Sequence, residues 1–137
     1  MEFIIDTCVV IDYFRQKPIA SEVFKRLLKS HSLYFSSITV FELYVGIQPD
    51  TKRSDLLDAL VEFVGVVPFD AVCAKKVADI ERYLRERGEV ISPKDTFIAA
   101  TGVAHDMPVI TSNNQHFDRL KDLVSYNTRS ILDLLQK

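Results

Sequence analysis

The sequence predicts an α/β fold in which a central parallel sheet of four to five short strands lies between two layers of helices. Short apolar runs suited to buried strands alternate along the chain with longer segments of helical periodicity. This alternation is typical of a parallel sheet covered on both faces, because each crossover helix packs against one side of it. No linker or internal repeat interrupts the 137 residues, so we expect one domain over residues 1–137.

The first expected strand is the apolar run Phe3–Ile5, which stops at Asp6. A helix over residues 7–14 follows, so Asp6 is expected just past the carboxyl end of a buried strand. Ligands of open α/β sheets bind in the crevice outside these strand ends. Asp6 therefore either caps the helix or anchors a divalent-cation site, and its position alone does not separate the two.

The remaining elements follow from periodicity and from the residues that start and stop helices. Helices are expected over residues 19–30, 51–64, 71–87, 93–105 and 128–137, with residues 37–39 leading into another that ends at Gly46. Strands are expected over residues 33–36, 66–67 and 108–110 and within 120–124. The expected caps are Asp50, Asp70 and Asn127, with Gly65 and Gly88 ending helices. Leu56 is expected to face inward, and Tyr44 is expected in the core or at a subunit contact.

The amino-acid composition and net charge limit the classes of protein to which this chain can belong. The chain is 47% hydrophobic and 26% charged, as ordinary globular proteins are. Its formal net charge of −2 excludes a strongly basic nucleic-acid-binding surface, but still allows RNA on a local basic strip. The sequence contains no run of 18 apolar residues and no signal-peptide pattern, so we expect a cytoplasmic protein with no membrane contact.

The cysteines and two of the histidines are expected to have no role in chemistry. Cys8 and Cys73 are far apart and each lies among apolar neighbours, so both are interpreted as buried thiols, not as a zinc site or a disulfide. His31 and His105 are isolated and are interpreted as ordinary surface or helix-end residues.

Two further acids are candidates for the site around Asp6. Glu42 follows Thr39 by three residues, and Asp95 follows Ser92 by three, which is the spacing of a capping box. Capping is therefore one explanation of both acids. The other is that each lies in the first turn of a helix near a strand end and points into the same crevice as Asp6. Asp12 is expected to face solvent or to pair with a neighbouring arginine.

The segment Thr111–Phe117, TSNNQHF, directly follows an expected strand. It is either a polar turn that caps a helix or the remaining wall of the pocket. In the second case Thr111, Asn113 and His116, together with Thr7 beside Asp6, are secondary site residues near a water or a phosphate.

Convergence of three carboxylates has a chemical consequence. Two carboxylates about 4 Å apart repel each other by about 4 kcal/mol at a surface-like dielectric. Such a cluster takes up either protons or a cation, and hard oxygen ligands select Mg²⁺ or Mn²⁺. A metal-activated water at such a site would hydrolyse phosphodiester bonds.

These residues carry a resemblance to a known family. The segments IIDTCVVIDYF, SSITVFELYVG and ISPKDTFIAATGVAHDMPVITSN, with the later HF, resemble PIN-domain toxins of the VapC type in order and along the whole chain. The resemblance implies a three-layer PIN-like fold and a Mg²⁺- or Mn²⁺-dependent endoribonuclease. It also implies the toxin of a toxin–antitoxin pair, a small antitoxin partner and a homodimer. By position, Asp6 and Asp95 match the family's metal-binding acids and Glu42 matches the acid of its middle motif.

The last motif departs from the family pattern. Relatives often have a fourth acid at one of the positions that Asn113 and His116 occupy here. We therefore expect one cation bound directly and a weak or substrate-dependent second. Two alternatives remain: a catalytically degenerate binding or dimerisation module, and a phosphotransfer domain with Asp6 as nucleophile. The second lacks an acid two residues after Asp6, where Cys8 stands.

Overall fold

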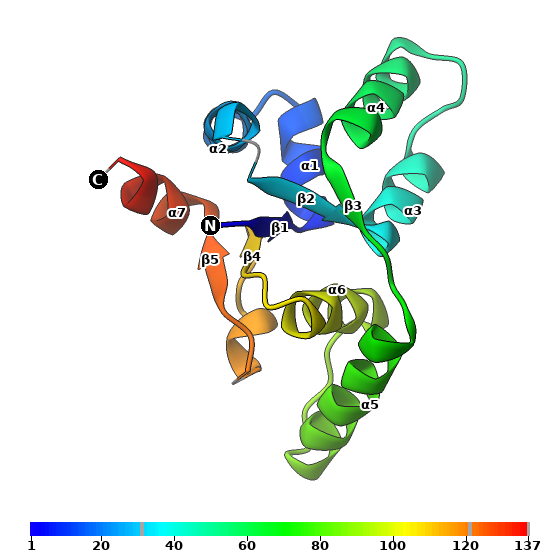
Figure 1. Ribbon diagram of the computed structural model, residues 1–137, viewed down its shortest axis with the longest axis vertical. Helices are drawn as coiled ribbons and strands as arrows, with labels where there is room; N and C mark the ends of the chain where they lie inside the picture. The colour runs from blue at the N-terminus through cyan, green and yellow to red at the C-terminus, as the bar shows by residue number, and fades with distance from the viewer. Residues whose placement is uncertain (31, 121, 137) are drawn as a thin grey trace.

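A computed structural model describes residues 1–30, 32–120 and 122–136 of the chain. Its centre is a parallel sheet of five strands in the order β3-β2-β1-β4-β5 (Figure 1). The strands are β1 Phe3–Ile5, β2 Leu33–Ser36, β3 Gly65–Val67, β4 Val109–Thr111 and β5 Ser125–Asn127. This confirms the predicted α/β fold class.

The order of the strands determines where a site can form. Strand β1 is central, with Ile5 paired to Phe35 of β2 on one side and to Ile110 of β4 on the other. The chain proceeds from β1 in one direction to β2 and β3, and returns on the other side to β4 and β5. The carboxyl end of β1 is therefore the point at which the winding of the sheet reverses, which is where open α/β sheets bind ligands.

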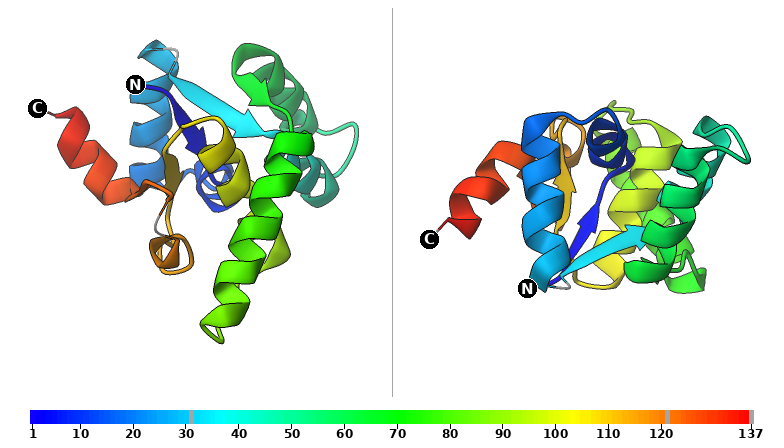
Figure 2. Two further views of the ribbon diagram at one scale, coloured as in Figure 1. Left: turned by 60° about the horizontal axis from the view of Figure 1, so that its bottom comes forward. Right: turned by 90° about the horizontal axis from the view of Figure 1, so that it is seen from above.

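Helices cover both faces of the sheet. They are α1 Thr7–Phe14, α2 Pro18–Ser30, α3 Ser37–Gly46, α4 Lys52–Phe63, α5 Ala71–Glu86, α6 Pro93–Ala104 and α7 Thr128–Leu135, with a short 3₁₀ turn at Phe117–Arg119. Figure 1 shows α1, α2, α4 and α7 on one side of the sheet and α5 and α6 on the other. Figure 2 (left) shows α5 and α6 side by side, and the two helices pack against each other.

Alternation along β1 builds a separate core on each face. Phe3 and Ile5 point into the core under α1, α2, α4 and α7, whereas Ile4 points into the core under α5 and α6. All three side chains are buried, so β1 is apolar on both faces, as expected for a central parallel strand. This explains why its apolar run is continuous and why the first polar residue, Asp6, marks its end.

The last predicted strand was placed too early. Strand β5 begins at Ser125, after the interval 120–124 in which we expected it, because Leu120 and Leu123 pack into the core on the α5 and α6 side. Lys121 in that interval lies outside the described residues, as do His31 and Lys137. Asn127 caps α7 as predicted, accepting from the backbone N–H of Arg129 at 3.0 Å.

One predicted N-cap and one predicted inward residue were wrong. Helix α4 is capped by Thr51, whose hydroxyl accepts from the Ser54 N–H at 3.2 Å, while Asp50 has a φ of 59° and lies outside the helix. Leu56 is exposed, contrary to the prediction. Tyr44 is also exposed, which leaves a subunit contact as its remaining expected role, and its hydroxyl donates to Asp58 at 2.6 Å.

Gly65 has a packing role and does not end a helix. It lies in β3, and a Cβ at this position would stand 2.4 Å from the ring of Tyr34 in the neighbouring strand. Within the described residues, no helix has both the length and the apolar character needed to span a membrane.

Candidate active site

Asp6 is the buried polar centre of the predicted crevice. Asp6 is 6% exposed, and its carboxylate accepts three hydrogen bonds. Oδ1 accepts from the backbone N–H of Thr7 at 2.8 Å, while Oδ2 accepts from the hydroxyl of Thr111 at 2.9 Å and the thiol of Cys8 at 3.1 Å. Asp6 is also the N-cap residue of α1, so the capping explanation holds in the structure and leaves Oδ2 for other contacts.

Asp6 lies in an electrostatic environment that opposes its charge. Burial raises the pKa of Asp6 above its ordinary value, and the nearby charge of Asp95 raises it further. The hydrogen bonds from Cys8, Thr111 and the Thr7 backbone act in the opposite direction and lower the pKa. The site therefore concentrates negative charge at the end of β1.

Glu42 approaches this site, but not from the first turn of a helix. Helix α3 begins at Ser37, and its N-cap is Ser36, whose hydroxyl accepts from the Ile38 N–H at 3.1 Å. The predicted capping box between Thr39 and Glu42 is therefore wrong. Glu42 lies in the second turn of α3.

The contacts of Glu42 link it to the Asp6 segment. The hydroxyl of Thr7 donates to Glu42 Oε1 at 2.9 Å and lies 3.0 Å from the buried hydroxyl of Thr39. Thr7 thus bonds to Asp6 through its backbone and to Glu42 through its side chain. On the outer side of the carboxylate, Lys94 Nζ lies 3.6 Å from Glu42 Oε2.

Asp95 does lie in the first turn of its helix, as the sequence predicted. Pro93 begins α6, and Ser92 makes no side-chain cap bond, so the capping explanation of Asp95 was wrong. The carboxylate instead pairs with His116, whose Nδ1 lies 2.9 Å from Asp95 Oδ2. The two side chains are 26% and 36% exposed, respectively, so this pair lies at the solvent side of the site.

The polar segment after β4 contacts Asp6 through Thr111 and Asp95 through His116. Thr111 is completely buried, and its hydroxyl, besides donating to Asp6, accepts from the backbone N–H of Asn113 at 3.1 Å. The side chain of Asn113 is exposed, so this residue contributes to the site through its backbone. Three of the four predicted secondary residues thus contact the acids, with Thr7 and Thr111 on Asp6 and His116 on Asp95, whereas Asn113 bonds to Thr111.

The three predicted acids are neighbours but do not form a closed ligand set. Their ligand atoms do not all lie within 4.8 Å of one another. Among the described residues, one group of three meets that criterion, and it consists of Asp70, Cys73 and His105. Asp12 takes no part, because it pairs with Lys17 at 3.4 Å and not with an arginine.

Two contacts of the site were not expected from the sequence. Cys8 is half-buried beside Asp6, where it also accepts from the Ser112 hydroxyl at 3.0 Å, and was expected only as an inert buried thiol. Lys94 was expected within a basic stretch that is usually a solvated helix face, with an RNA-contacting strip as the less favoured alternative; its contact with Glu42 was not expected. Its place one residue before Asp95, in a helix facing the crevice, is the signal in the sequence that pointed to it.

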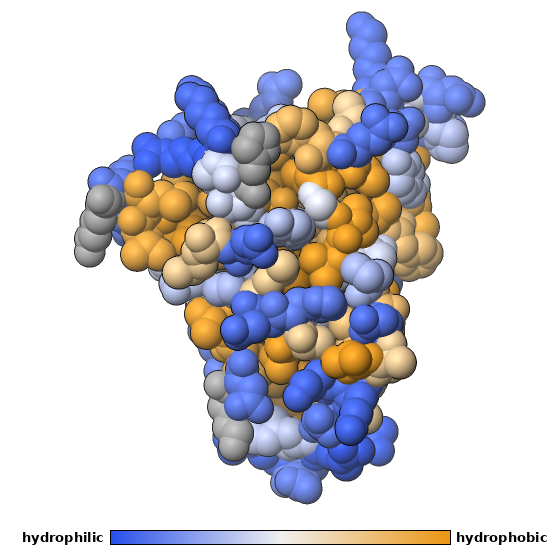
Figure 3. All heavy atoms as spheres, in the orientation of Figure 1, coloured by the Kyte–Doolittle hydropathy of each residue, from blue (hydrophilic) through white to orange (hydrophobic). Residues whose placement is uncertain are grey.

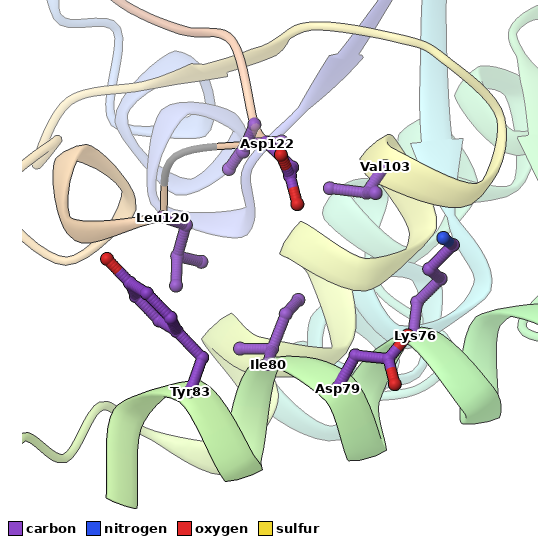
Figure 4. Close-up of a pocket in the computed structure, with 8 residues that line it drawn as sticks. Lys76, Asp79, Ile80, Tyr83, Val103, Leu120 and Asp122 are labelled. Atoms are coloured by element: carbon purple, nitrogen blue, oxygen red, sulfur yellow. The ribbon is translucent and has the colours of Figure 1, made fainter. Parts of the chain in front are cut away.

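A separate small cavity lies away from these acids. It measures about 100 Å³ between α5, α6 and the segment before β5, with Ile80, Val103 and Leu120 as apolar walls and Lys76, Asp79 and Asp122 around them (Figure 4). None of the predicted site residues lines it. We therefore place the candidate chemistry at the carboxyl end of β1.

Comparison with known proteins agrees with this geometry. The PIN domain family matches residues 3–123. "Ribonuclease VapC1" of Methanocaldococcus jannaschii is 31% identical over 121 residues, which cover 88% of this chain and 82% of that protein. "tRNA(fMet)-specific endonuclease VapC" of Shigella flexneri is 26% identical, with 90% and 95% of the two chains covered.

Solved structures show the same fold. The structure of VapBC2 from Rickettsia felis bound to a promoter DNA fragment superposes with a TM-score of 0.83 at 21% identity, covering 93% of this chain and 98% of that one. FitAcB from Neisseria gonorrhoeae superposes with a TM-score of 0.77 at 27% identity over the same shares of both chains. The family match, the VapC relatives and the shared fold together show that this chain belongs to the PIN-domain family, in its VapC group.

Proposed function

We propose that this chain is a Mg²⁺- or Mn²⁺-dependent endoribonuclease and the toxin of a toxin–antitoxin pair. The observation that carries the proposal is the position of Asp6. It is a buried carboxylate at the reversal point of the sheet, and its pKa is raised by burial and by the charge of Asp95. A buried charge of this kind requires a compensating partner, and a divalent cation supplies it. The ribonuclease and endonuclease names of the relatives support RNA as substrate.

The donor set fits a hard cation. Asp6 and Asp95 would hold it, with Glu42 completing the acidic rim, and carboxylate oxygens are the ligands that Mg²⁺ and Mn²⁺ prefer. When bound, such an ion lowers the pKa of water and offsets the charge on the leaving oxygen of a phosphodiester. Because the Asp95–His116 pair is partly exposed, the cation and the RNA backbone reach the site from that side.

The chain's own residues orient the acids. The Thr7 N–H and the Thr111 hydroxyl fix the two oxygens of Asp6, and their hydrogen bonds help to keep it ionised against the effect of burial. The Thr7 hydroxyl fixes Glu42 in the same way. A group held by several hydrogen bonds needs little rearrangement when the substrate binds, which favours catalysis.

Lys94 is proposed to contact the RNA backbone. Its side chain is 55% exposed, lies 3.6 Å from Glu42 and stands over the ring of Phe41 at 5.9 Å. A chain with a net charge of −2 needs local positive charge to hold a polyanion, and Lys94 supplies it at the edge of the acidic site.

An antitoxin segment is proposed to cover the groove beside Glu42. This groove holds about 300 Å³ and is lined by Ile11 and Phe14 of α1, Leu43 of α3 and Ile47 directly after α3, together with Arg15. Two solved structures with this fold are described as a toxin–antitoxin complex and as a member of the VapBC family of toxin–antitoxin systems. Because the groove borders an acidic site residue, an occupant would also block substrate.

The homodimer remains a proposal as well. Exposed apolar side chains on α3 and α4 include Phe41, Val45, Leu56 and Phe63, and Figure 3 shows apolar atoms gathered over the face formed by α4 and β3. Sedimentation of the chain alone and with its antitoxin would give the oligomeric state.

RNA cleavage by single-residue variants tests the enzyme. Asp6→Asn and Asp95→Asn should each lose Mg²⁺- or Mn²⁺-dependent cleavage of RNA while keeping the circular dichroism spectrum of the wild type. Removal of the metal with a chelator should have the same effect. Asp12→Asn is the matched control, because this acid pairs with Lys17 outside the site and should cleave normally. Unchanged cleavage in both site variants would refute the proposal.

A degenerate module is the less favoured alternative, because the relatives bear ribonuclease and endonuclease names. Calorimetric titration with Mn²⁺ separates the two: a degenerate site should show no saturable binding below millimolar metal.

A further inference from the structure

A second group of metal-ligating side chains lies where α5 begins and α6 ends. Asp70, Cys73 and His105 each offer one ligand atom, and these atoms all lie within 4.8 Å of one another. His105 follows Asp95 by ten residues on α6, which places the two about 15 Å apart along the helix axis. The group is therefore separate from the acids around Asp6.

The imidazole of His105 has a nitrogen without a partner. Its Nε2 is buried and makes no hydrogen bond to any described residue. Buried side-chain nitrogens in folded proteins nearly always have a partner, so an orphaned one calls for an explanation. The backbone holds His105 in place, because its N–H bonds to the Thr101 carbonyl at 3.1 Å and Asp106 turns the chain with a φ of 54°.

The start of α5 brings the other two ligands together. Asp70 caps the helix by accepting from the Cys73 N–H at 3.0 Å through Oδ1, which leaves its Oδ2 outside the cap bond. Cys73 is completely buried and is not in a disulfide. Its thiol donates to the Pro68 carbonyl at 3.7 Å and also interacts with the side chains of Asp70 and Thr101. The cap spacing of three residues thus places a carboxylate and a thiol on the same side of the first turn, facing His105.

We propose that Asp70, Cys73 and His105 form a Zn²⁺ site that ties the start of α5 to the end of α6. One sulfur, one nitrogen and one oxygen ligand are typical of zinc, whereas the oxygen-only acids around Asp6 suit Mg²⁺ or Mn²⁺. Zinc bonds of about 2.0–2.3 Å place tetrahedral ligands about 3.5 Å apart, so the exposed side chain of Asp70 has only a short way to move. Water takes the fourth position.

Binding changes the protonation of the thiol. Burial raises the pKa of Cys73, so without metal the sulfur keeps its proton at neutral pH. When Zn²⁺ binds, the S–H bond breaks, the proton leaves to solvent and the sulfur donates its electron pair to the metal. The ion joins two helices that already pack together, and α6 carries Asp95 at its other end. The site therefore stabilises the helix on which that acid is mounted.

Cobalt and zinc binding to the full-length chain, first stripped of metal, tests the proposal. Co²⁺ bound by a thiolate gives a sulfur-to-cobalt absorption band, and competition against a zinc indicator gives the Zn²⁺ affinity. The wild type should bind one equivalent with that band. Cys73→Ser should lose the band, and His105→Gln should bind Zn²⁺ more than about 100-fold more weakly, because changes outside the ligands alone cost about 10–100-fold.

Two controls separate this site from the acids at β1. Cys8→Ser removes the thiol beside Asp6, and Asp95→Asn removes an acid there, and both should keep the band and the zinc affinity. Absence of the band in the wild type would overturn the proposal, as would its loss in Cys8→Ser with retention in Cys73→Ser. If Cys73→Ser does not fold, His105→Gln provides the test, because His105 is half-buried at a helix end and its replacement should leave the fold intact. An unchanged zinc affinity in His105→Gln would reject the site.

Discussion

The hydroxyl of Thr111 provides a stability prediction that probes the charge on Asp6. Thr111 is completely buried and donates to Asp6 Oδ2 at 2.9 Å. Valine has nearly the same shape, so Thr111→Val removes the donor without opening a large cavity. A hydrogen bond to a charged group contributes about 1.5–3 kcal/mol, and we expect the free energy of unfolding at neutral pH to fall by about that amount. The melting temperature should fall by about 4 °C for each kcal/mol.

The loss should depend on pH in a defined direction. Burial and Asp95 raise the pKa of Asp6 in the folded state above its unfolded value, so the folded protein binds a proton there more readily than the unfolded chain. The stability of the wild type therefore falls as pH rises from below the ordinary aspartate range through the folded pKa of Asp6. Without the Thr111 donor that pKa is higher still and the fall is larger. At about pH 4, where more of Asp6 is protonated, only a neutral hydrogen bond of about 0.5–1.5 kcal/mol is lost.

Guanidinium unfolding of metal-free protein at about pH 4 and at neutral pH measures both values. Thr101→Val is the matched control. Thr101 is also completely buried, but its hydroxyl donates to the uncharged Phe97 carbonyl at 2.9 Å. The control should lose about 0.5–1.5 kcal/mol at both pH values. An equal loss for Thr111→Val at the two pH values would refute the assignment of a charged, electrostatically strained Asp6.

Two further predictions test packing and thiol chemistry. Gly65→Ala should lower the free energy of unfolding by about 1–3 kcal/mol, because the new Cβ would clash with the Tyr34 ring. Gly46→Ala is the control and should not destabilise the protein, because a Cβ there meets open space. Equal melting temperatures for the two variants would contradict this prediction. Burial and the charge of Asp6 raise the pKa of Cys8, so iodoacetamide should modify Cys8 more slowly in the wild type than in Asp6→Asn, as measured by mass spectrometry; equal rates would show that Asp6 does not suppress its thiolate.

The strand ends could be predicted from the sequence because they follow from local chemistry. The apolar run of β1 is continuous, since both faces of a central strand are buried, and it can end only at a residue such as Asp6. Pro93 begins α6 and thereby sets Asp95 in the first turn. These signals depend on a few consecutive residues, and the parallel alternation of the fold then brings the strand ends to one edge.

The position of Glu42 could not be predicted in the same way. The interval from Thr39 to Glu42 fits a capping box, but β2 runs directly into α3, so Ser36 at the strand end becomes the cap. Thr39 is instead buried within the helix, with its hydroxyl next to that of Thr7. A pairing across 32 residues leaves no local trace in the sequence.

The neighbours of His105 and Cys8 could not be predicted for a related reason. Each is isolated along the chain, but in the fold each lies next to side chains from distant segments. His105 meets Cys73 only because α5 packs along α6, and Cys8 meets Thr111 only because β4 pairs with β1. Contacts between ligand types that lie 30 or more residues apart depend on how the elements pack, which spacing rules within one segment do not capture.

His116 changes the electrostatics of the site in a way that bears on how many cations it can hold. An acid at this position would add a negative charge near Asp95 and favour a second ion. The imidazole instead occupies Oδ2 of Asp95 at 2.9 Å, so one oxygen of that carboxylate is already engaged on the solvent side. On the other side, Lys94 partly neutralises Glu42 in the same manner. Both outer carboxylates are thus paired, whereas Asp6 has no cationic partner among the contacts described above. We therefore propose that a single cation binds close to Asp6 and that any second one depends on the phosphate of the proposed RNA substrate.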